Sequence, residues 1–268
     1  MIFVVRPYGD HSNRLFQSTH IEAFCRENNI RFSNPSLWDM QGIYSNNKLY
    51  PVCLKLLLKL LNALAKLGIL KIVELDDTSR YEEYARLFMR SPCILISGWA
   101  FKNPDLTKKH QQFFADKYAV KTSLTQNNDL LKNISRWKQD EHRVIGLHIR
   151  RGDYSEFQGG RYFYSDQQYQ TIMQRMDSLL RETGQGKFKV VVFSNESVDL
   201  FPGDASVVTS RNKWFIDQAA MGQCDYLIGP PSTFTLWASY VGTAKFLQIK
   251  SADQKFTLDD FTQYHGQQ

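Results

Sequence analysis

The chain has 268 residues, 43% of them hydrophobic and 22% charged, which is typical of a globular protein with enough apolar material for one large or two small cores. Its net charge of +6 is uneven, because residues 1–140 hold 20 Lys and Arg against 13 Asp and Glu, whereas residues 141–268 hold 13 against 14. No dense run of Arg or Lys and no RNA-binding signature accompanies the basic half, which disfavours a nucleic-acid partner.

Short apolar runs alternate with helical patterns along the chain. We expect strands at residues 2–5, 93–97, 144–148, 190–194, 226–228 and 246–249, and helices that include residues 18–28, 166–182 and 214–224. This alternation predicts an α/β fold with parallel sheets. The polar stretch 126–140 predicts a boundary between two domains, 1–140 and 141–268.

Residues 50–75 are the most hydrophobic segment. Lys55, Lys59, Asn62 and Lys66 recur every three or four residues, so they lie on one face of a helix with leucines on the others. The lysines argue against a membrane span. Two interpretations remain open: a helix packed into the first domain, which we favour, or a helix resting on an anionic membrane surface.

The cysteines and the N-terminus bear on the compartment. Cys25, Cys53, Cys93 and Cys224 form no CxxC pair, so we expect free thiols in a reducing compartment and no metal site. The opening "MIFVVRPYGD" becomes polar too quickly for a signal peptide or anchor. We therefore expect a cytoplasmic protein, and peripheral contact with the inner face of the membrane stays open.

The first polar motif, "RPYGDHSNRLFQ" at residues 6–17, follows the opening strand. Gly9 permits close backbone approach, and Asp10, His11 and Asn13 lead into a helix that could receive an anion or a sugar. The alternative is a simple N-cap in which Ser12 or Asn13 is the capping residue.

The second motif, "VIGLHIRRGDY", ends a buried strand with two arginines. Arg150 and Arg151 can each donate paired hydrogen bonds to a phosphate. His148 faces the same side of the strand as Arg150, while Arg151 faces the other way, which favours a structural role for Arg151. Asp153 either orients an arginine or accepts hydrogen bonds from a ligand.

The third motif, "CDYLIGPPSTFTLWASYVG" at residues 224–242, joins a strand to a helix. Ser232 and Thr233 open this helix, where hydroxyl and free N–H groups suit a phosphate; capping by either residue is compatible with that role. The chain contains no GxxxxGK[ST] loop, no GxGxxG after a strand and no DxD motif. An anionic donor such as a nucleotide sugar would therefore have to be neutralised by arginines and helix ends instead of a divalent ion.

These motifs resemble those of one enzyme family. "HIRRGDY" resembles the HxRRxD motif of bacterial-type α-1,2-fucosyltransferases, which α-1,6- and protein O-fucosyltransferases share more loosely. Residues 217–239 resemble the family's D-x-x-x-M-x-x-C…S-S-F-S-x-W-A-A stretch, and residues 9–17 are similar to its G-x-x-G-N-Q-x-F-Q loop. The three motifs occur in the family's order across nearly the whole chain.

The resemblance implies a GT-B-like fold, with two Rossmann-like domains facing across a cleft, and inverting transfer of fucose from GDP-fucose without a metal or other cofactor. It implies that the first domain serves the acceptor and the second the GDP-sugar. Arg150 would hold the diphosphate and His148 would contact the donor. Asn13 would reach the sugar, while the phosphates would be cradled at the helix start by Ser232, Thr233 and Phe234.

The sequence departs from the family pattern at several positions. Ser12 and Arg14 replace a glycine and a glutamine of the first loop, and Pro230 and Pro231 precede Ser232. Ser194, Asn195 and Glu196 replace an S-D-D sequence, which leaves the base pocket and the acceptor open.

We therefore expect a fucosyltransferase that makes an α-1,2 linkage to a galactoside of a glycan. Arg150 is the leading catalytic candidate, and Asp10 and His11 are candidates for the base by position only. The candidate substrate-binding residues are Asn13, His148, Arg151, Asp153, Ser194, Asn195, Glu196, Ser232, Thr233 and Phe234. The alternatives are a related enzyme with another nucleotide sugar or linkage, and a non-catalytic GDP-sugar-binding module.

Overall fold

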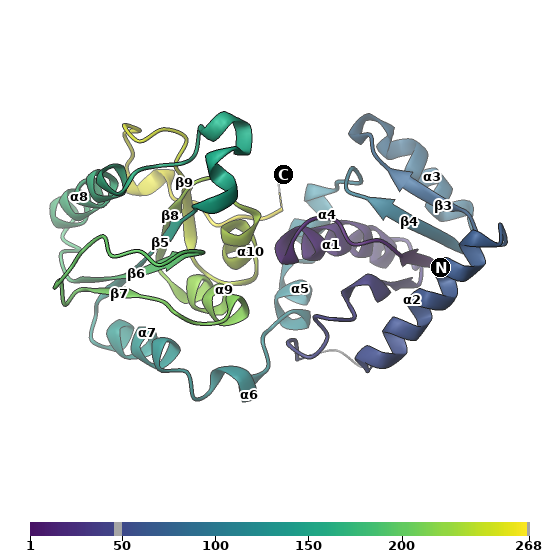
Figure 1. Ribbon diagram of the computed structural model, residues 1–268, viewed down its shortest axis with the longest axis horizontal. Coiled ribbons are helices and arrows are strands. Elements are labelled where there is room, and N and C mark those ends of the chain that lie inside the picture. Colours follow the sequence, from purple (N-terminus) through teal and green to yellow (C-terminus); the bar gives the residue numbers. More distant parts are fainter. Residues whose placement is uncertain (46–49, 267–268) are drawn as a thin grey trace. The chain divides into compact units, whose positions relative to one another are not determined.

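The computed structural model describes residues 1–45 and 50–266, and the chain divides into two compact units (Figure 1). The first unit contains Met1–Lys121 and the described end of the chain from His265, and the second contains Thr122–Tyr264. The boundary thus lies between residues 121 and 122 instead of after residue 140. The polar stretch that suggested the later boundary is largely helix α7 (Asp129–Gln139), which belongs to the second unit.

Helix α7 shows why composition misplaced the boundary. The segment is polar on average, but its few apolar residues recur at helical spacing and are all buried: Leu130, Leu131, Ile134 and Trp137. Asn128 caps the helix by accepting a hydrogen bond from the Leu131 N–H at 3.2 Å. One apolar face is enough to attach α7 to β5 and α9 of the second unit.

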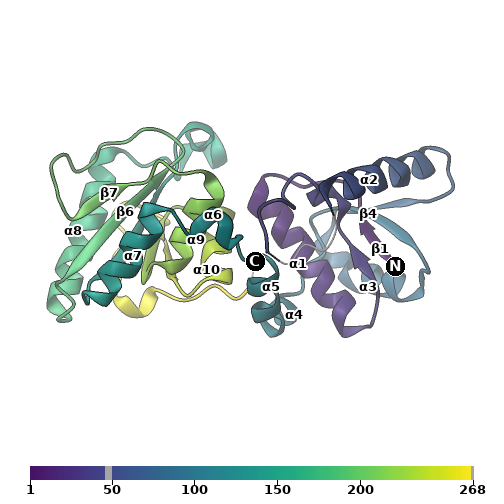
Figure 2. The ribbon, with the colours of Figure 1, turned by 90° about the horizontal axis from the view of Figure 1, so that it is seen from below.

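The first unit is built on a parallel sheet with the order β2-β1-β4-β3. Its strands are β1 (Ile2–Val4), β2 (Phe32–Ser33), β3 (Ile72–Leu75) and β4 (Ile94–Gly98), and its α-helices are α1 (His11–Glu27), α2 (Pro51–Lys66), α3 (Tyr81–Arg90), α4 (Pro104–Lys109) and α5 (Gln111–Lys117). Alternate strand residues pack against α1 and α3 on one face and against α2 on the other (Figure 2).

The expected helix over residues 50–75 is two elements. Helix α2 ends at Lys66, and strand β3 begins at Ile72. Gly68 adopts φ +72, a left-handed conformation in which its N–H and that of Ile69 bond back to the last turn, at 3.0 Å each, to the carbonyls of Ala65 and Leu64. This glycine ends the helix in the manner common for helix C-termini.

The second unit is built on a parallel sheet with the order β7-β6-β5-β8-β9. Its strands are β5 (Arg143–Ile149), β6 (Phe188–Ser194), β7 (Val207–Thr209), β8 (Tyr226–Gly229) and β9 (Lys245–Gln248), and its other α-helices are α6 (Thr122–Thr125), α8 (Asp166–Glu182), α9 (Trp214–Gln223) and α10 (Thr233–Val241). Helix α8 packs on one face, and α7, α9 and α10 cover the other (Figure 1).

Both sheets reverse their winding direction at one point. In the second unit the chain runs outward from β5 through β6 to β7, and then returns to the other side of β5 with β8 and β9. The first unit has β2 on one side of β1 and β4 on the other. Open α/β sheets of this kind bind ligands outside the carboxyl ends of the strands that flank the reversal.

No helix in the described ranges 1–45 and 50–266 combines the length and apolar composition that crossing a bilayer requires.

Candidate functional site

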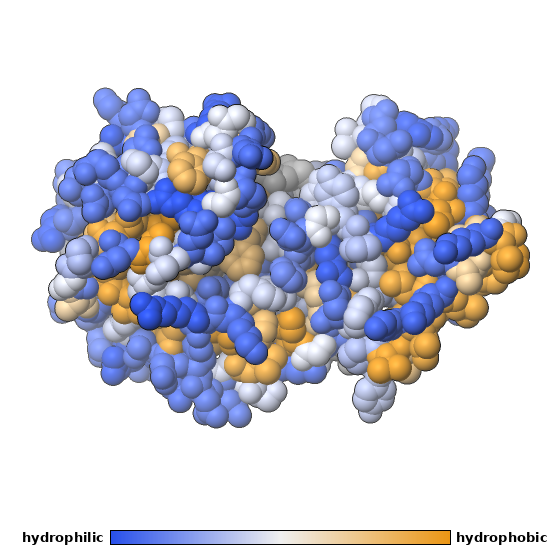
Figure 3. All heavy atoms as spheres, viewed as in Figure 1, coloured by the Kyte–Doolittle hydropathy of each residue, from blue (hydrophilic) through white to orange (hydrophobic). Residues whose placement is uncertain are grey.

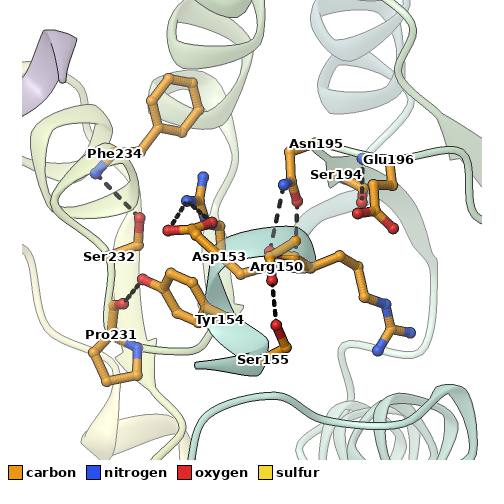
Figure 4. Close-up of polar contacts among 12 residues, drawn as sticks. Arg150, Asp153, Tyr154, Ser155, Ser194, Asn195, Glu196, Pro231, Ser232 and Phe234 are labelled. Atoms are coloured by element: carbon orange, nitrogen blue, oxygen red, sulfur yellow. Dashed lines mark hydrogen bonds and ion pairs between the residues drawn. The ribbon is translucent and has the colours of Figure 1, made fainter. Parts of the chain in front are cut away.

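The second unit gathers the expected donor residues at the carboxyl ends of β5, β6 and β8 (Figure 4). Strand β5 is followed by Arg150, Arg151 and the 3₁₀ turn Gly152–Ser155. Strand β6 runs into Asn195 and Glu196, and β8 turns through Pro230 and Pro231 into α10. Because β5 and β8 flank the reversal of the sheet, these segments lie where the fold itself favours a ligand.

Arg150 is held in place before any ligand arrives. Its Nη2 donates to both carboxylate oxygens of Asp153, at 2.8 and 3.1 Å, and its guanidinium lies 4.8 Å from the centre of the Tyr154 ring. The side chain is 22% exposed, and its Nε is buried with no hydrogen-bond partner in the described structure. Asp153 therefore orients this arginine, one of the two roles predicted for it.

Arg151 is directed into the unit. Its guanidinium donates to the Tyr164 carbonyl and to the Asp166 carboxylate, and it lies 5.2 and 5.5 Å from the centres of the Phe163 and Tyr169 rings. The residue is 9% exposed. These contacts attach the β5 turn to the start of α8 and favour the structural role.

Asn195 connects the ends of β5 and β6. Its Oδ1 accepts a hydrogen bond from the Arg151 N–H at 3.0 Å, and its Nδ2 donates to the Arg151 carbonyl at 3.4 Å. The Ser194 hydroxyl accepts from the Glu196 N–H at 3.2 Å. The side chains of Asn195 and Glu196 border Gly152, where a Cβ would lie 3.4 Å from Nδ2 and 3.5 Å from Oε1. An exposed carboxylate thus stands beside the β5 turn.

His148 is buried beneath the site, with 4% of its surface exposed. Its Nδ1 lies 2.5 Å from the Thr235 hydroxyl, and its ring is 5.7 Å from that of Phe234. Burial, and secondly the charge of Arg150, lowers the pKa of His148 to about 3, so the imidazole is neutral at physiological pH. Strand β8 passes very close at this level, because a Cβ on Gly229 would lie 2.6 Å from the His148 carbonyl oxygen.

Helix α10 begins at the same edge. Ser232 is its N-cap and accepts a hydrogen bond from the Phe234 N–H at 3.3 Å, as the capping interpretation predicts. The Tyr154 hydroxyl donates to the Pro231 carbonyl and so connects this turn with the one that follows β5. The first turn of an α-helix presents N–H groups without intrahelical partners, here at the Thr233 end, which favours an anion.

The first motif lies in the first unit, after β1. Helix α1 begins at His11 with Asp10 at the N-cap, so Ser12 and Asn13 are not capping residues, contrary to that interpretation. Asn13 instead lies in the first turn and packs over Gly9, where φ is +60 and a Cβ would be 2.5 Å from the asparagine Nδ2. Burial lowers the pKa of His11, while the charge of Asp10 opposes that shift.

The departure at Arg14 has a structural explanation. Its guanidinium forms an ion pair with Asp39 at 2.6 Å, and the Arg14 side chain is only 11% exposed in this pair. The arginine therefore attaches α1 to the segment that follows η1 (Pro35–Leu37).

A cluster missed by sequence reasoning lies at the reversal of the first sheet. The rings of Tyr8 and Trp99, which follow β1 and β4, are stacked at 5.1 Å and 12°. The Lys102 ammonium lies 2.9 Å from the centre of the Trp99 ring, and burial lowers the pKa of that lysine to about 7. Aromatic residues within a few positions of the strand ends were the available signal, but their pairing was not apparent from the sequence.

Within residues 1–45 and 50–266, no three His, Cys, Asp or Glu side chains are grouped so that they could hold a metal ion.

The sequence of the chain was compared with protein families and with curated proteins. The model of glycosyl transferase family 11 matches residues 41–264. A search of the curated proteins gave no match.

Two solved fucosyltransferases have a similar fold. A mutant of FUT1 from Arabidopsis thaliana in complex with GDP has a TM-score of 0.53 and 10% identity, covering 93% of this chain and 71% of that chain. NodZ alpha-1,6-fucosyltransferase soaked with GDP-fucose has a TM-score of 0.54 and 12% identity, covering 97% and 96%. Selenomethionine NodZ from Bradyrhizobium has a TM-score of 0.53 and 12% identity, covering 94% and 96%. The predicted α/β, GT-B-like fold with two Rossmann-like units is confirmed.

Proposed function

Because the chain belongs to glycosyl transferase family 11, we propose that it transfers fucose from GDP-fucose to a hydroxyl group of a glycan. The GDP and GDP-fucose of the FUT1 and NodZ structures support this donor. The HIRRGDY motif supports an α-1,2 linkage to a galactoside, made with inversion and without a metal ion. NodZ is an α-1,6 enzyme, so the linkage is the part of the proposal that needs direct measurement.

One observation carries the proposal: Arg150 and the start of α10 lie at the two strands that flank the sheet reversal. When the bond from fucose to GDP breaks, negative charge develops on the β-phosphate. A guanidinium fixed by Asp153 and the N–H groups at Thr233 would stabilise that charge without having to reorganise first. Ser232 and Phe234 would border the phosphates.

The remaining donor contacts would come from the β5 and β6 ends. The exposed side chain of Glu196 would offer a carboxylate to the nucleoside, and Asn195, whose amide is bonded to the Arg151 backbone, would border it, with Ser194 holding the turn. Arg151 acts as a positioning residue in this scheme. A direct donor contact by His148 remains a prediction, and its bond to Thr235 supports a role in orienting the first turn of α10.

The acceptor side is assigned to the first unit. The acceptor hydroxyl attacks the anomeric carbon, the bond from that carbon to the GDP oxygen breaks, and the hydroxyl proton passes to a base. Burial lowers the pKa of His11 and so favours its neutral imidazole, which can accept a proton. Asp10 is an exposed carboxylate and can accept the proton as well. Asn13 would reach the fucose, and Tyr8 offers an aromatic face to a sugar ring.

A thermal-shift panel of nucleotide sugars tests the donor. A ligand that binds only the folded protein at about 100 times its Kd stabilises it by about 2.7 kcal/mol. GDP and GDP-fucose should raise the melting temperature, whereas UDP-sugars should not. Transfer to galactosides, followed by NMR of the product, then establishes the linkage. GDP binding without turnover on any acceptor would favour a non-catalytic binding module.

A further inference from the structure

Helix α2 and the turn after it expose an unusual amount of apolar surface. Val52, Leu56 and Leu60 are 66%, 60% and 56% exposed, and the turn adds Leu67 at 73% and Ile69 at 64%. The spacing of four places the first three on one face of the helix. Figure 3 shows hydrophobic surface, crossed by hydrophilic side chains, over the region that α2 occupies in Figure 1. We call these five residues the α2 apolar stripe.

The stripe is separate from the face by which α2 packs. Leu54 and Leu61 are buried, at 3% and 5% exposed, and Leu61 packs in one core cluster with Phe3 and Leu95 of the sheet. The helix therefore does not need the stripe for its own attachment. Contiguous exposed apolar patches are rare on protein surfaces, and they mark sites of interaction.

A row of lysines borders the stripe. Lys55, Lys59 and Lys66 share one helical face, Lys71 follows in the turn, and residues 50–71 contain no Asp or Glu. Lys59 and Lys66 are exposed to solvent, and Lys55 lies with its ammonium 4.5 Å from the centre of the Trp38 ring. A surface that is apolar on one side and purely cationic on the other fits a partner in which anionic groups lie next to apolar groups.

A basic cavity lies at the end of the helix. It has a volume of about 520 Å³ and is lined by Lys66 and Lys71, with Arg6 and Asn62 on its wall. Arg6 also lies 4.0 Å from Glu74, an exposed contact that leaves the net charge of the lining positive. Cationic side chains around a cavity of this size suit the phosphate of a lipid headgroup.

We propose that α2 and the turn after it dock on the surface of an anionic lipid bilayer. The α2 apolar stripe enters the boundary between headgroups and acyl chains, Lys59 and Lys66 contact lipid phosphates, and the basic cavity holds one headgroup. A second copy of the chain fits less well, because no carboxylate in the segment could pair with the lysines that the copy would bring. The proposal does not rest on the assigned sugar donor.

Cosedimentation of the full chain with vesicles tests the proposal. We expect binding to vesicles of phosphatidylcholine mixed with phosphatidylglycerol, weakened by salt, and little binding to phosphatidylcholine alone. The double variant Leu56→Gln with Leu60→Gln should abolish binding. Lys59→Gln with Lys66→Gln should weaken it about fivefold per lysine, which corresponds to about 1 kcal/mol each.

Matched controls lie elsewhere on the chain. Met89→Gln removes an apolar side chain that is 64% exposed on α3, and Lys132→Gln with Lys255→Gln removes two exposed charges from the second unit. Both should bind vesicles like the wild type. The melting temperature, measured on every variant, shows that each one folds.

Three outcomes would overturn the proposal. Equal binding to neutral and anionic vesicles would show that the lysines do not contribute to binding. A loss of vesicle binding in the control variants as large as in the α2 variants would show that α2 is not the binding surface. Absence of vesicle binding, together with a dimer in light scattering that the leucine double variant dissociates, would assign the stripe to a second copy.

Discussion

Replacing Arg150 by lysine keeps the positive charge and tests whether the guanidinium binds the diphosphate of the donor. The arginine is fixed by two bonds to Asp153 and by the Tyr154 ring, and its buried Nε has no partner in the described structure. A guanidinium can donate paired N–H groups to a diphosphate in a planar geometry. A lysine ammonium is a single point of charge on a flexible stem and cannot reproduce that arrangement.

The magnitude follows from what the lysine loses. Removing one preorganised donor to a developing negative charge costs on the order of 2–4 kcal/mol in the transition state. Since about 1.4 kcal/mol corresponds to a factor of ten, turnover should fall by about 30-fold to about 1000-fold. GDP should bind more weakly as well, but by a smaller factor, because the full charge on the β-phosphate develops only as the bond to fucose breaks.

Turnover, GDP affinity and melting temperature should be measured on the same preparation. Arg151→Lys is the matched control, because its guanidinium is bonded inside the unit to the Tyr164 carbonyl and to Asp166. That variant should lose about 1–3 kcal/mol of stability and keep more of its turnover per folded molecule. A folded Arg150→Lys protein with wild-type turnover would refute the role of the guanidinium.

Asn13→Ala should reduce transfer with melting temperature and GDP affinity nearly unchanged, because Asp10, and not Asn13, is the N-cap of α1; a lower melting temperature with normal turnover would leave the residue structural. Transfer should continue at the same rate in excess chelator, and a loss that manganese or magnesium restores would contradict metal independence. The pKa of His148 is about 3 in the folded protein and about 6.5 in the unfolded chain. Protonation of the unfolded chain therefore lowers the free energy of unfolding as the pH falls below about 6.5. Urea unfolding should show that His148→Gln removes about 2 kcal/mol of the stability loss between about pH 7 and about pH 5, and an unchanged pH dependence would contradict this.

The strands that sequence reasoning found are those buried on both faces. Residues 144–148 and 190–194 are continuous apolar runs, and both lie inside central strands of the second sheet. The β2 and β7 edge strands escaped notice because they are only two and three residues long and partly exposed. Strand β3 was absorbed into the preceding leucine-rich helix, although Gly68 marked the break.

The polar residues gathered in the second unit were more accessible to prediction than the cluster in the first unit. Arg150 follows β5 directly and Ser232 comes three residues after β8, so chain order alone placed them at a sheet edge. Tyr8 and Trp99 meet only because β1 and β4 are neighbours in the sheet. Pairing between distant strands cannot be read from local periodicity.

The division of the chain makes its two halves unequal as building blocks. The second unit is one uninterrupted stretch, Thr122–Tyr264, whereas the first is completed by residues that come after it. His265 and Gly266 join the first unit through a 2.7 Å bond between His265 and Gln111 and a 3.5 Å bond from the Thr107 hydroxyl to the Gly266 carbonyl. Recombination or protein design could therefore exchange residues 122–264 as one contiguous segment, while the first unit keeps the residues that complete it.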